Sequence, residues 1–147
     1  MSTKRKTVKK PKLSTLMKKA DDLMSLYIRK KYASHEGYVL CCSCEKRFHW
    51  KVMDCGHFIS RRHLSTRYVE ENAHPEDKYC NRFNHDHHIG YTQFMIKTYG
   101  NDMIEWLKKE SKRTLSQSEK RAIIEDAIEY YGNKIKESGY EMQDFKL

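Results

Sequence analysis

The chain has 147 residues, and its 29 Lys and Arg against 20 Asp and Glu give a formal net charge of +9. This length favours one ordinary domain or a small core with helical extensions, and the 38% of hydrophobic residues excludes a large apolar interior. The sequence contains no run of about 18 apolar residues, and this excludes a membrane span. The N-terminus lacks the apolar segment of a signal peptide, so we expect a cytoplasmic protein.

The first twelve residues are predicted to form a disordered basic arm, because they are too polar to bury. They contain six basic residues and no acidic one, namely Lys4, Arg5, Lys6, Lys9, Lys10 and Lys12. The arm could be a solubilising tail, but contact with the phosphates of nucleic acid is favoured because basic residues continue along the chain. The candidate DNA-binding residues are Lys4, Arg5, Lys6, Lys9, Lys10, Arg61, Arg62, Arg67 and Arg82.

The first half of the chain predicts one helix and several short strands. Apolar residues at three- and four-residue steps indicate an amphipathic helix over roughly Ser14–Ala33. Tyr38–Leu40 is typical of a short strand that leads into a group of cysteines. Residues 41–80 are rich in loop signals, with further strands expected near Trp50–Val52 and His57–Ile59.

The second half is predicted to be helical. One helix is expected over Asn81–Tyr99, ending at Gly100, and a short one over Asp102–Glu110. The residues of the first that are expected to be buried are Phe83, Ile89, Phe94, Met95 and Ile96. The segment Ser116–Glu119 has the pattern of a capping box and opens a last helix that runs to about Tyr131.

The cysteines predict a structural zinc site. Cys41 and Cys44 have the C-x-x-C spacing at which two thiolates reach one zinc ion. The same spacing occurs at Asp77 and Cys80, with aspartate in place of one cysteine, so Cys41, Cys44, Asp77 and Cys80 are the predicted ligands. The fourth ligand could instead be Cys42, Cys55 or His74. The alternative to a zinc site is that these cysteines are merely buried.

The stretch between and after the cysteines contains the residue types that phosphodiester hydrolysis requires. His57 offers an imidazole that can deprotonate water as a general base. Asp54, Asn72 and Asn81 offer oxygen atoms, which suit the hard cations Mg²⁺ and Mn²⁺. A divalent cation stabilises the pentacovalent phosphate and the departing oxygen. The sequence therefore favours metal-dependent hydrolysis of a phosphodiester.

These residues also carry a family resemblance. The block resembles the HNH (ββα-metal) nucleases, in which a zinc knuckle often braces the hairpin and helix that hold one catalytic cation. Residues 10–100, about two thirds of the chain, are more closely similar to the phage NinG/Rap recombination endonuclease family. The matching stretches are Tyr27–Arg29, Cys41-x-x-Cys44, Trp50–Asp54, Gly56–Ile59, Arg67 with Glu71-Asn72, and His74-Pro75 to Cys80-Asn81. Asp77 departs from the family pattern, which has cysteine there. Cys80-Asn81 also resembles the endonuclease VII junction resolvases, in which an asparagine metal ligand follows the last knuckle cysteine.

The resemblance implies a catalytic set of His57, Asn72, Asn81 and Asp54. His57 would be the general base, and Asn72 would fix the loop and orient this base. Asn81 and Asp54 would hold the catalytic cation. Asp54 precedes His57 by three residues, whereas the family ligand adjoins the base.

A third cation ligand is implied at His85, four residues after Asn81 and so on the same face of the predicted helix. A direct metal role is also open for His87 or His88. The alternative is that His85, His87 and His88 form an exposed polar face of that helix.

The expected fold class is α+β and mostly helical. A small zinc-knuckle-braced ββα-metal (HNH-like) core is expected over residues 38–100. The basic arm (1–12) and an N-terminal helix (13–37) would precede it, and a C-terminal helical extension (101–147) would follow it.

The resemblance implies a metal-dependent, structure-selective DNA endonuclease that cleaves Holliday junctions and D-loops during phage recombination in the host bacterial cytosol. Its cofactors would be catalytic Mg²⁺ or Mn²⁺ and structural Zn²⁺. Its partners would be branched DNA, other recombination proteins and a second copy, with the homodimer formed through the apolar helices at 14–33 or 117–131. One alternative is a zinc-knuckle DNA-binding recombination accessory protein without cleavage. Another is an HNH endonuclease that nicks linear duplex.

Overall fold

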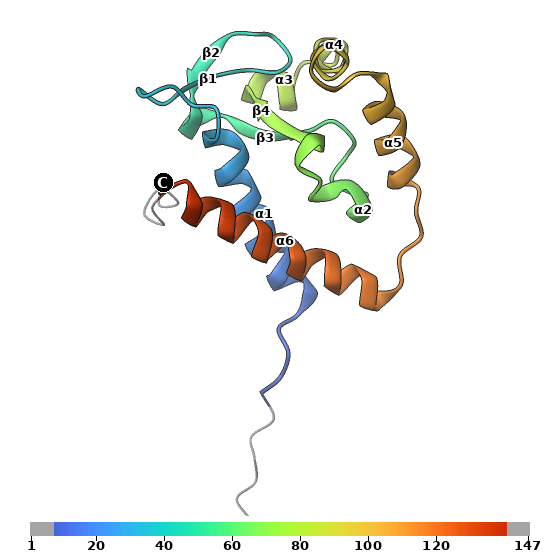
Figure 1. The fold of residues 1–147 in the computed structure, drawn as a ribbon. Helices are drawn as coiled ribbons and strands as arrows, with labels where there is room; N and C mark the ends of the chain where they lie inside the picture. The colour runs from blue at the N-terminus through green and yellow to red at the C-terminus, as the bar shows by residue number, and fades with distance from the viewer. Residues whose placement is uncertain (1–7, 141–147) are drawn as a thin grey trace, which may run out of the picture.

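The structure, a computed structural model, describes residues 8–140, and helices make up most of this part of the chain (Figure 1). The longer helices are α1 (Leu13–Lys30), α4 (His87–Tyr99), α5 (Asn101–Ser111) and α6 (Gln117–Glu137). The short ones are η1 (Trp50–Val52), α2 (Leu64–Arg67), η2 (Glu70–Asn72) and α3 (Lys78–Arg82). The strands form two antiparallel pairs, β1 (Tyr38–Leu40) with β2 (Arg47–His49) and β3 (Asp54–His57) with β4 (Ala73–Glu76). The expected class, a mostly helical α+β fold, is confirmed.

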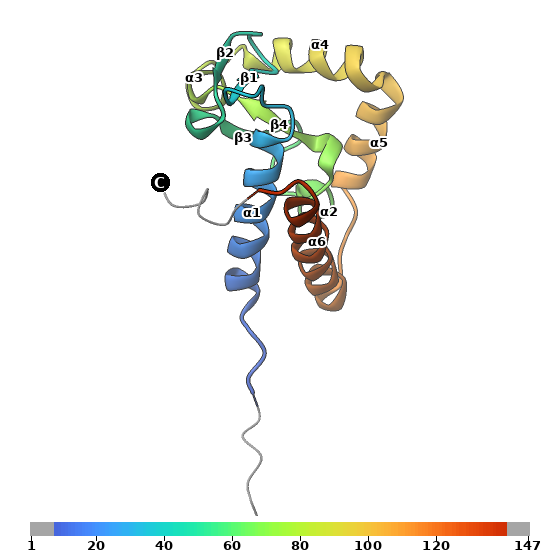
Figure 2. The same ribbon diagram turned by 60° about the vertical axis from the view of Figure 1, so that its left-hand side comes forward.

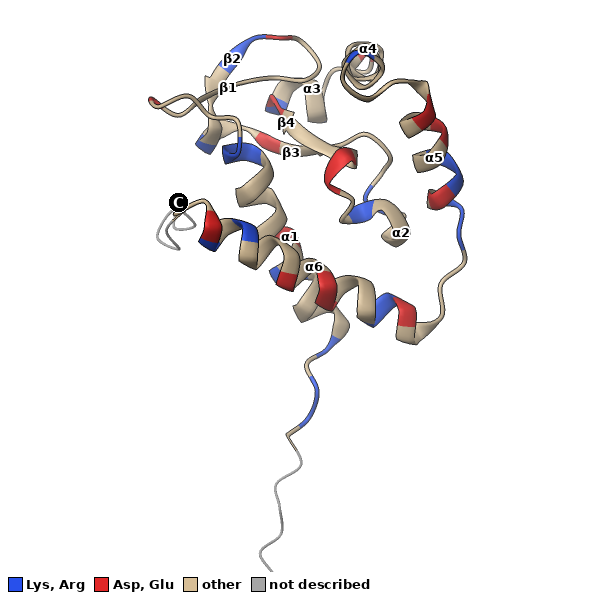
Figure 3. Cartoon of the chain, viewed as in Figure 1, with Lys and Arg blue, Asp and Glu red and all other residues tan. Residues whose placement is uncertain are grey.

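The expected basic arm lies mostly outside the described residues, and Lys4, Arg5 and Lys6 therefore stay predicted DNA contacts. Lys9 and Lys10 are exposed in the segment that leads into α1 (Figure 3). Acidic and basic side chains are interspersed along α5 and α6 in the same view. None of the described helices combines the length and the apolar character that crossing a membrane requires.

Helices α1 and α6 lie side by side and share the main hydrophobic core (Figures 1 and 2). Met24 and Leu26 of α1 and Ile124 and Tyr131 of α6 are all buried in this cluster. The hydroxyl of Tyr131 donates a hydrogen bond of 2.8 Å to the backbone oxygen of Tyr68, which ties α6 to the centre of the chain. The C-terminal helix is thus packed directly against the N-terminal one.

Three of the predicted helices are confirmed, with ends shifted by a few residues. α1 and α5 match the helices expected at Ser14–Ala33 and Asp102–Glu110. α6 starts at the predicted capping box, where Ser116 Oγ accepts from the backbone N–H of Glu119 at 3.2 Å. The Glu119 carboxylate accepts in return from the N–H of Ser116 at 2.7 Å, so two backbone donors at the helix start are satisfied.

The single helix expected over Asn81–Tyr99 is wrong, because the chain forms two helices there, α3 and α4. Asn84 Oδ1 accepts a hydrogen bond of 3.0 Å from the backbone N–H of Asp86. A side chain that takes over a backbone donor in this way competes with helix formation. The break also turns the apolar residues outward: Phe83 and Ile89, expected to be buried, are 68% and 62% exposed.

The sequence predicted the four short strands only in part. β1 is confirmed, but the strand expected at Trp50–Val52 is the 3₁₀ helix η1, which His49 caps by accepting from the N–H of Lys51 at 3.3 Å. The strand expected at His57–Ile59 lies earlier, in β3. β4 was not expected, because all four of its residues are buried and it contains Pro75, so it shows no alternating pattern.

β3, β4 and α3 follow one another as an antiparallel pair and a helix, and this unit positions the candidate site. The register pairs Asp54 with Glu76 and Gly56 with His74, so these four residues share one face of the pair. His57 ends β3 on the opposite face. A Cβ atom on Gly56 would lie 2.7 Å from Cβ of Glu76, so only glycine allows this approach.

A second buried cluster packs α4 and α5 against the end of β3. It contains Phe58, Tyr91, Met95 and Leu107. The hydroxyl of Tyr91 donates a hydrogen bond of 2.7 Å to the backbone oxygen of Gly56. The position of β3 is therefore set by packing against α1 and by the hydrogen bond from Tyr91 of α4.

If α6 is part of the core, shortening a buried isoleucine in it should cost far more stability than shortening an exposed one. Ile124 is fully buried, whereas Ile96 of α4 is 44% exposed. We expect Ile124→Ala to lower the free energy of unfolding by about 2–5 kcal/mol and Ile96→Ala by less than about 1 kcal/mol. Urea unfolding followed by circular dichroism measures both, and equal losses would contradict the packing of α6.

Candidate functional site

Three cysteines come together where the β1–β2 turn meets α3. Cys41 and Cys44 lie in the turn and Cys80 lies in α3, and the three sulfur atoms are all within 4.8 Å of one another. The turn folds back because the N–H of Cys41 donates to Lys46 O at 2.8 Å and Glu45 adopts a positive φ of 61°. These three thiols could hold a metal ion, which would fasten the β1–β2 hairpin to α3.

Among the described residues, the cluster of possible metal ligands contains these three cysteines and no fourth member. Asp77 was the predicted fourth ligand, but its carboxylate does not join them, and its backbone N–H instead donates to Cys41 Sγ at 3.3 Å. As the N-cap residue of α3, Asp77 contributes its main chain to the cluster.

The three alternatives for the fourth ligand are also directed elsewhere. Cys42 lies with its sulfur 3.7 Å from Glu76 Oε2. Both ring nitrogens of His74 are engaged, by the hydroxyls of Tyr91 at 2.9 Å and Tyr99 at 2.8 Å. Cys55 lines the large cavity described below.

Burial favours the neutral, protonated thiols of Cys41 and Cys80. Burial, followed by the neighbouring Cys41, raises the pKa of Cys80 to about 12. Burial also raises the pKa of Cys41. A cation bound between the sulfur atoms would reverse this effect and release the protons, as metal binding by thiols does.

A cavity of about 740 Å³ lies between α1, β3, α3 and α4. Its walls include the sequence-predicted residues Asp54, His57, Arg61, Asn81 and Arg82. Two residues of the implied catalytic and cation-binding set do not line it: Asn72 is fully buried, and His85 is exposed in the break between α3 and α4. His85 thus does not share a helical face with Asn81, so the geometric argument for it as a third cation ligand does not hold.

His57 is held as a neutral imidazole with one defined tautomer. Its Nε2 lies 2.9 Å from the backbone oxygen of Arg67. Because a carbonyl oxygen only accepts, Nε2 carries the proton and Nδ1 keeps its lone pair. Burial lowers the pKa of His57 below its ordinary value of 6.5, so the ring is uncharged at neutral pH. This is the state in which an imidazole can accept a proton from water.

Asn72 fixes the loop that follows His57. Its Oδ1 accepts from the N–H of Ile59 at 2.8 Å, and its Nδ2 donates to the backbone oxygens of Ile59 and Thr66, each at 3.0 Å. The side chain is fully buried. Its hydrogen bonds thereby connect the start of the β3–β4 loop, at Ile59, with Thr66. Thr66 precedes Arg67, whose backbone oxygen binds His57, so Asn72 helps to position that oxygen.

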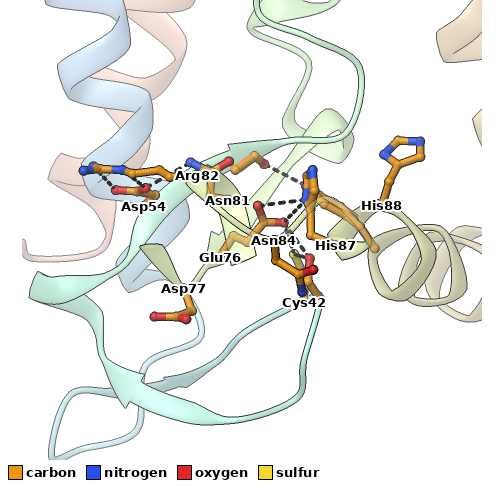
Figure 4. A network of polar contacts seen from close by, with 12 residues as sticks. Cys42, Asp54, Glu76, Asp77, Asn81, Arg82, Asn84, His87 and His88 are labelled. Atoms are coloured by element: carbon orange, nitrogen blue, oxygen red, sulfur yellow. Dashed lines mark hydrogen bonds and ion pairs between the residues drawn. The ribbon is translucent and has the colours of Figure 1, made fainter. Parts of the chain in front are cut away.

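Asp54 and Asn81 contact each other, but they do not fit a cation in this arrangement (Figure 4). Arg82 donates to both oxygens of Asp54, at 2.8 Å each, and Asn81 Nδ2 donates to Oδ2 at 2.9 Å. The guanidinium therefore fills the position at the carboxylate that a cation would need. Arg82, expected to contact DNA, is instead paired here with Asp54.

The other arginines predicted to bind DNA differ in how free they are. Arg67 is bound inside the molecule, because its Nε and Nη2 donate to the two oxygens of Asp21 at 2.9 and 2.6 Å. Its Nη1 donates to the backbone oxygen of Arg61 at 2.8 Å. The side chains of Arg61 and Arg62 are exposed, and Arg61 lines the cavity. Arg61 is thus the better placed of these residues for a phosphate.

Sequence reasoning considered His87 as a metal ligand but missed the group that it forms with Glu76 and Ser43. Ser43 Oγ donates to Glu76 Oε2 at 2.6 Å, and His87 Nδ1 lies 3.4 Å from Oε1. The group escaped notice because β4 was not predicted and His87 was expected in the middle of a helix. No sequence signal marks Glu76, because the burial of all four residues of Ala73–Glu76 is visible only in the structure.

The comparisons with known proteins agree with the resemblance noted above at the level of the family. The family model described as bacteriophage lambda NinG protein matches residues 1–140. The chain therefore belongs to the NinG family, a phage family associated with recombination. No curated protein and no solved structure matches the chain significantly.

The cysteine cluster predicts one bound metal ion per chain. We expect Cys80→Ser to abolish metal retention, because it removes one of three ligands, and Cys55→Ser, outside the cluster, to preserve it. Asp77→Cys should keep or tighten binding, because a thiolate is a better zinc ligand than a carboxylate. Elemental analysis of the purified proteins measures the metal content and identifies the ion. Equal metal content in the Cys80→Ser and Cys55→Ser variants would contradict the assignment.

Proposed function

We propose that this protein is a metal-dependent, structure-selective DNA endonuclease that cleaves branched recombination intermediates such as Holliday junctions and D-loops. The observation that carries the proposal is His57: a neutral imidazole with its Nδ1 lone pair available, on the wall of a cavity that Arg61 also lines. Membership of a recombination-associated phage family supports the substrate class. The HNH-like organisation of β3, β4 and α3 and the resemblance to endonuclease VII belong to the same proposal.

In the proposed mechanism, Nδ1 of His57 removes a proton from a water molecule that attacks the phosphorus in line with the departing 3′-oxygen. The bond from Nε2–H to Arg67 O holds the ring and stabilises the imidazolium that forms. Arg61 neutralises charge on the phosphate or on a neighbouring one. A divalent cation, when bound, supplies the positive charge that stabilises the pentacovalent phosphate. The products carry 5′-phosphate and 3′-hydroxyl ends.

The remaining components of the proposal concern metals and assembly. The three-cysteine cluster would hold zinc, because thiolate ligands suit this ion. Mg²⁺ or Mn²⁺ would serve the reaction. Symmetric cleavage of a junction requires two active sites, which a homodimer supplies, and other recombination proteins are proposed as further partners. The basic arm would contact DNA phosphates.

The first test compares a labelled four-way junction with a matched linear duplex at one salt concentration, with Mg²⁺, Mn²⁺ or EDTA. We expect metal-dependent cuts in the junction, and we expect His57→Ala to reduce the cleavage rate at least about 100-fold because the general base is lost. Junction affinity should stay within a few-fold. His85→Ala is the matched control and should cleave normally, since His85 lies outside the cavity.

Each other outcome of this test has a definite meaning. Normal cleavage by His57→Ala would show that another group is the base. Tight junction binding without cleavage under any metal would favour the DNA-binding accessory protein. Equal nicking of the linear duplex would favour the plain HNH nicking enzyme.

The lowered pKa of His57 predicts the pH dependence of cleavage. The ring must be unprotonated to act as the base, so the rate should rise with pH through a midpoint below 6.5 and be level near pH 7. Single-turnover cleavage of the junction, with the metal saturating at each pH, measures this profile. A rate that still rises about tenfold per pH unit above pH 8 would indicate attack by hydroxide without His57.

A further inference from the structure

Glu76 is an unusual group in this molecule, because its carboxylate is buried and only partly satisfied. The residue is 0% exposed and lies on β4 beneath Gly56. Oε2 accepts a hydrogen bond of 2.6 Å from Ser43 Oγ and lies 3.7 Å from the sulfur of Cys42. Oε1 is buried and accepts no hydrogen bond. A buried carboxylate oxygen without a partner is costly, so the site calls for a positive group beside it.

The basic side chain beside it is His87, at the start of α4 (Figure 4). Its Nδ1 lies 3.4 Å from Oε1 and 3.5 Å from Oε2. A charge-assisted hydrogen bond between imidazolium and carboxylate is normally about 2.7–2.9 Å long, so this pair is too far apart for one. The imidazole and the carboxylate therefore face each other without forming a short hydrogen bond.

The separation does fit two ligands of one metal ion. Ligand atoms about 2.1 Å from the same ion are about 3.0 Å apart at a right angle and about 3.4 Å apart at the tetrahedral angle. The distance of 3.4 Å from Nδ1 to Oε1 lies at the upper end of this range. A cation between them would satisfy Oε1 and offset the buried negative charge.

We propose that Glu76 and His87 hold a divalent cation, with Mn²⁺ favoured over Mg²⁺ because an imidazole nitrogen is among the ligands. His87 lines the cavity that contains His57, so water or a phosphate oxygen can complete the coordination from that side. Ser43 orients the carboxylate through Oε2. A role for this ion in cleavage rests on the proposed function. The binding of the ion to Glu76 and His87 does not.

The Glu76 site explains why Asp54 is not needed as a ligand. Asp54 has both oxygens engaged by Arg82, whereas Glu76 has an oxygen without a hydrogen bond. The two carboxylates are paired across β3 and β4 in the register. The cation ligand is thus supplied by the second strand of the pair, beside the glycine that precedes His57.

The test is Mn²⁺ binding by the full-length protein, loaded first with one equivalent of Zn²⁺ to occupy the thiols, and followed by electron paramagnetic resonance of the free ion. We expect one Mn²⁺ site, weakened about tenfold or more in Glu76→Gln and in His87→Gln. His88→Gln is the matched control: His88 is the next residue, lines the same cavity and stacks on Phe58, away from Glu76. His88→Gln and Asp54→Asn should bind within about threefold of the unmodified protein.

Because Glu76 is fully buried, circular dichroism must show that Glu76→Gln is folded; His87, with 26% of its side chain exposed, provides the variant that does not depend on this. No Mn²⁺ site in the unmodified protein, normal binding by His87→Gln, or loss of binding in Asp54→Asn would each overturn the assignment. Normal Mn²⁺ binding without junction cleavage would leave the ion site standing and remove the endonuclease proposal instead.

Discussion

The contact between Gly56 and Glu76 is the constraint on which the candidate site depends. Because residue 56 has no side chain, Glu76 can lie against β3. A Cβ atom on residue 56 would be only 2.7 Å from the Cβ atom of Glu76. The same glycine offers its backbone oxygen to Tyr91, which fixes α4 and hence His87. His57 follows directly along the strand. Any larger residue at 56 would separate the strands and move all of these groups.

Sequence reasoning located the imidazole proposed as the general base and the loop-fixing amide, but not the groups that surround them. His57 and Asn72 stand in a recognisable order, and the structure places them at the two ends of one strand connection. Local hydrogen bonds were harder to predict. Asn84 ends the helix by binding Asp86, and this moves His85 away from the site and brings His87 to its edge. Such a choice between two backbone arrangements depends on tertiary contacts as much as on residue pattern.

Positive charge in this chain has two different uses, which composition alone cannot separate. Arg67 and Arg82 each form two hydrogen bonds to an aspartate, and these bonds hold α1 and α3 in place around the cavity. Arg61 and Arg62 are exposed. A paired guanidinium must give up its carboxylate before it can bind a phosphate, so Arg61 and Arg62 are the freer to bind one. The net charge of +9 counts Arg67 and Arg82, although each of them is paired with an aspartate. The positive charge that is free to attract a phosphate is therefore smaller than the number of basic residues suggests.

The two proposed metal sites can coexist because their ligands differ in softness. Three thiols favour zinc, whereas a carboxylate with an imidazole and water suits a harder divalent ion that exchanges ligands more readily. Cys80 and Asn81 are adjacent in α3, so the thiol site braces the same short helix that borders the cavity. A tightly held structural ion can thus keep α3 fixed while a more weakly held ion binds and leaves with the substrate. The difference in ligand chemistry therefore keeps zinc at the thiols of Cys41, Cys44 and Cys80 and the harder cation at Glu76 and His87.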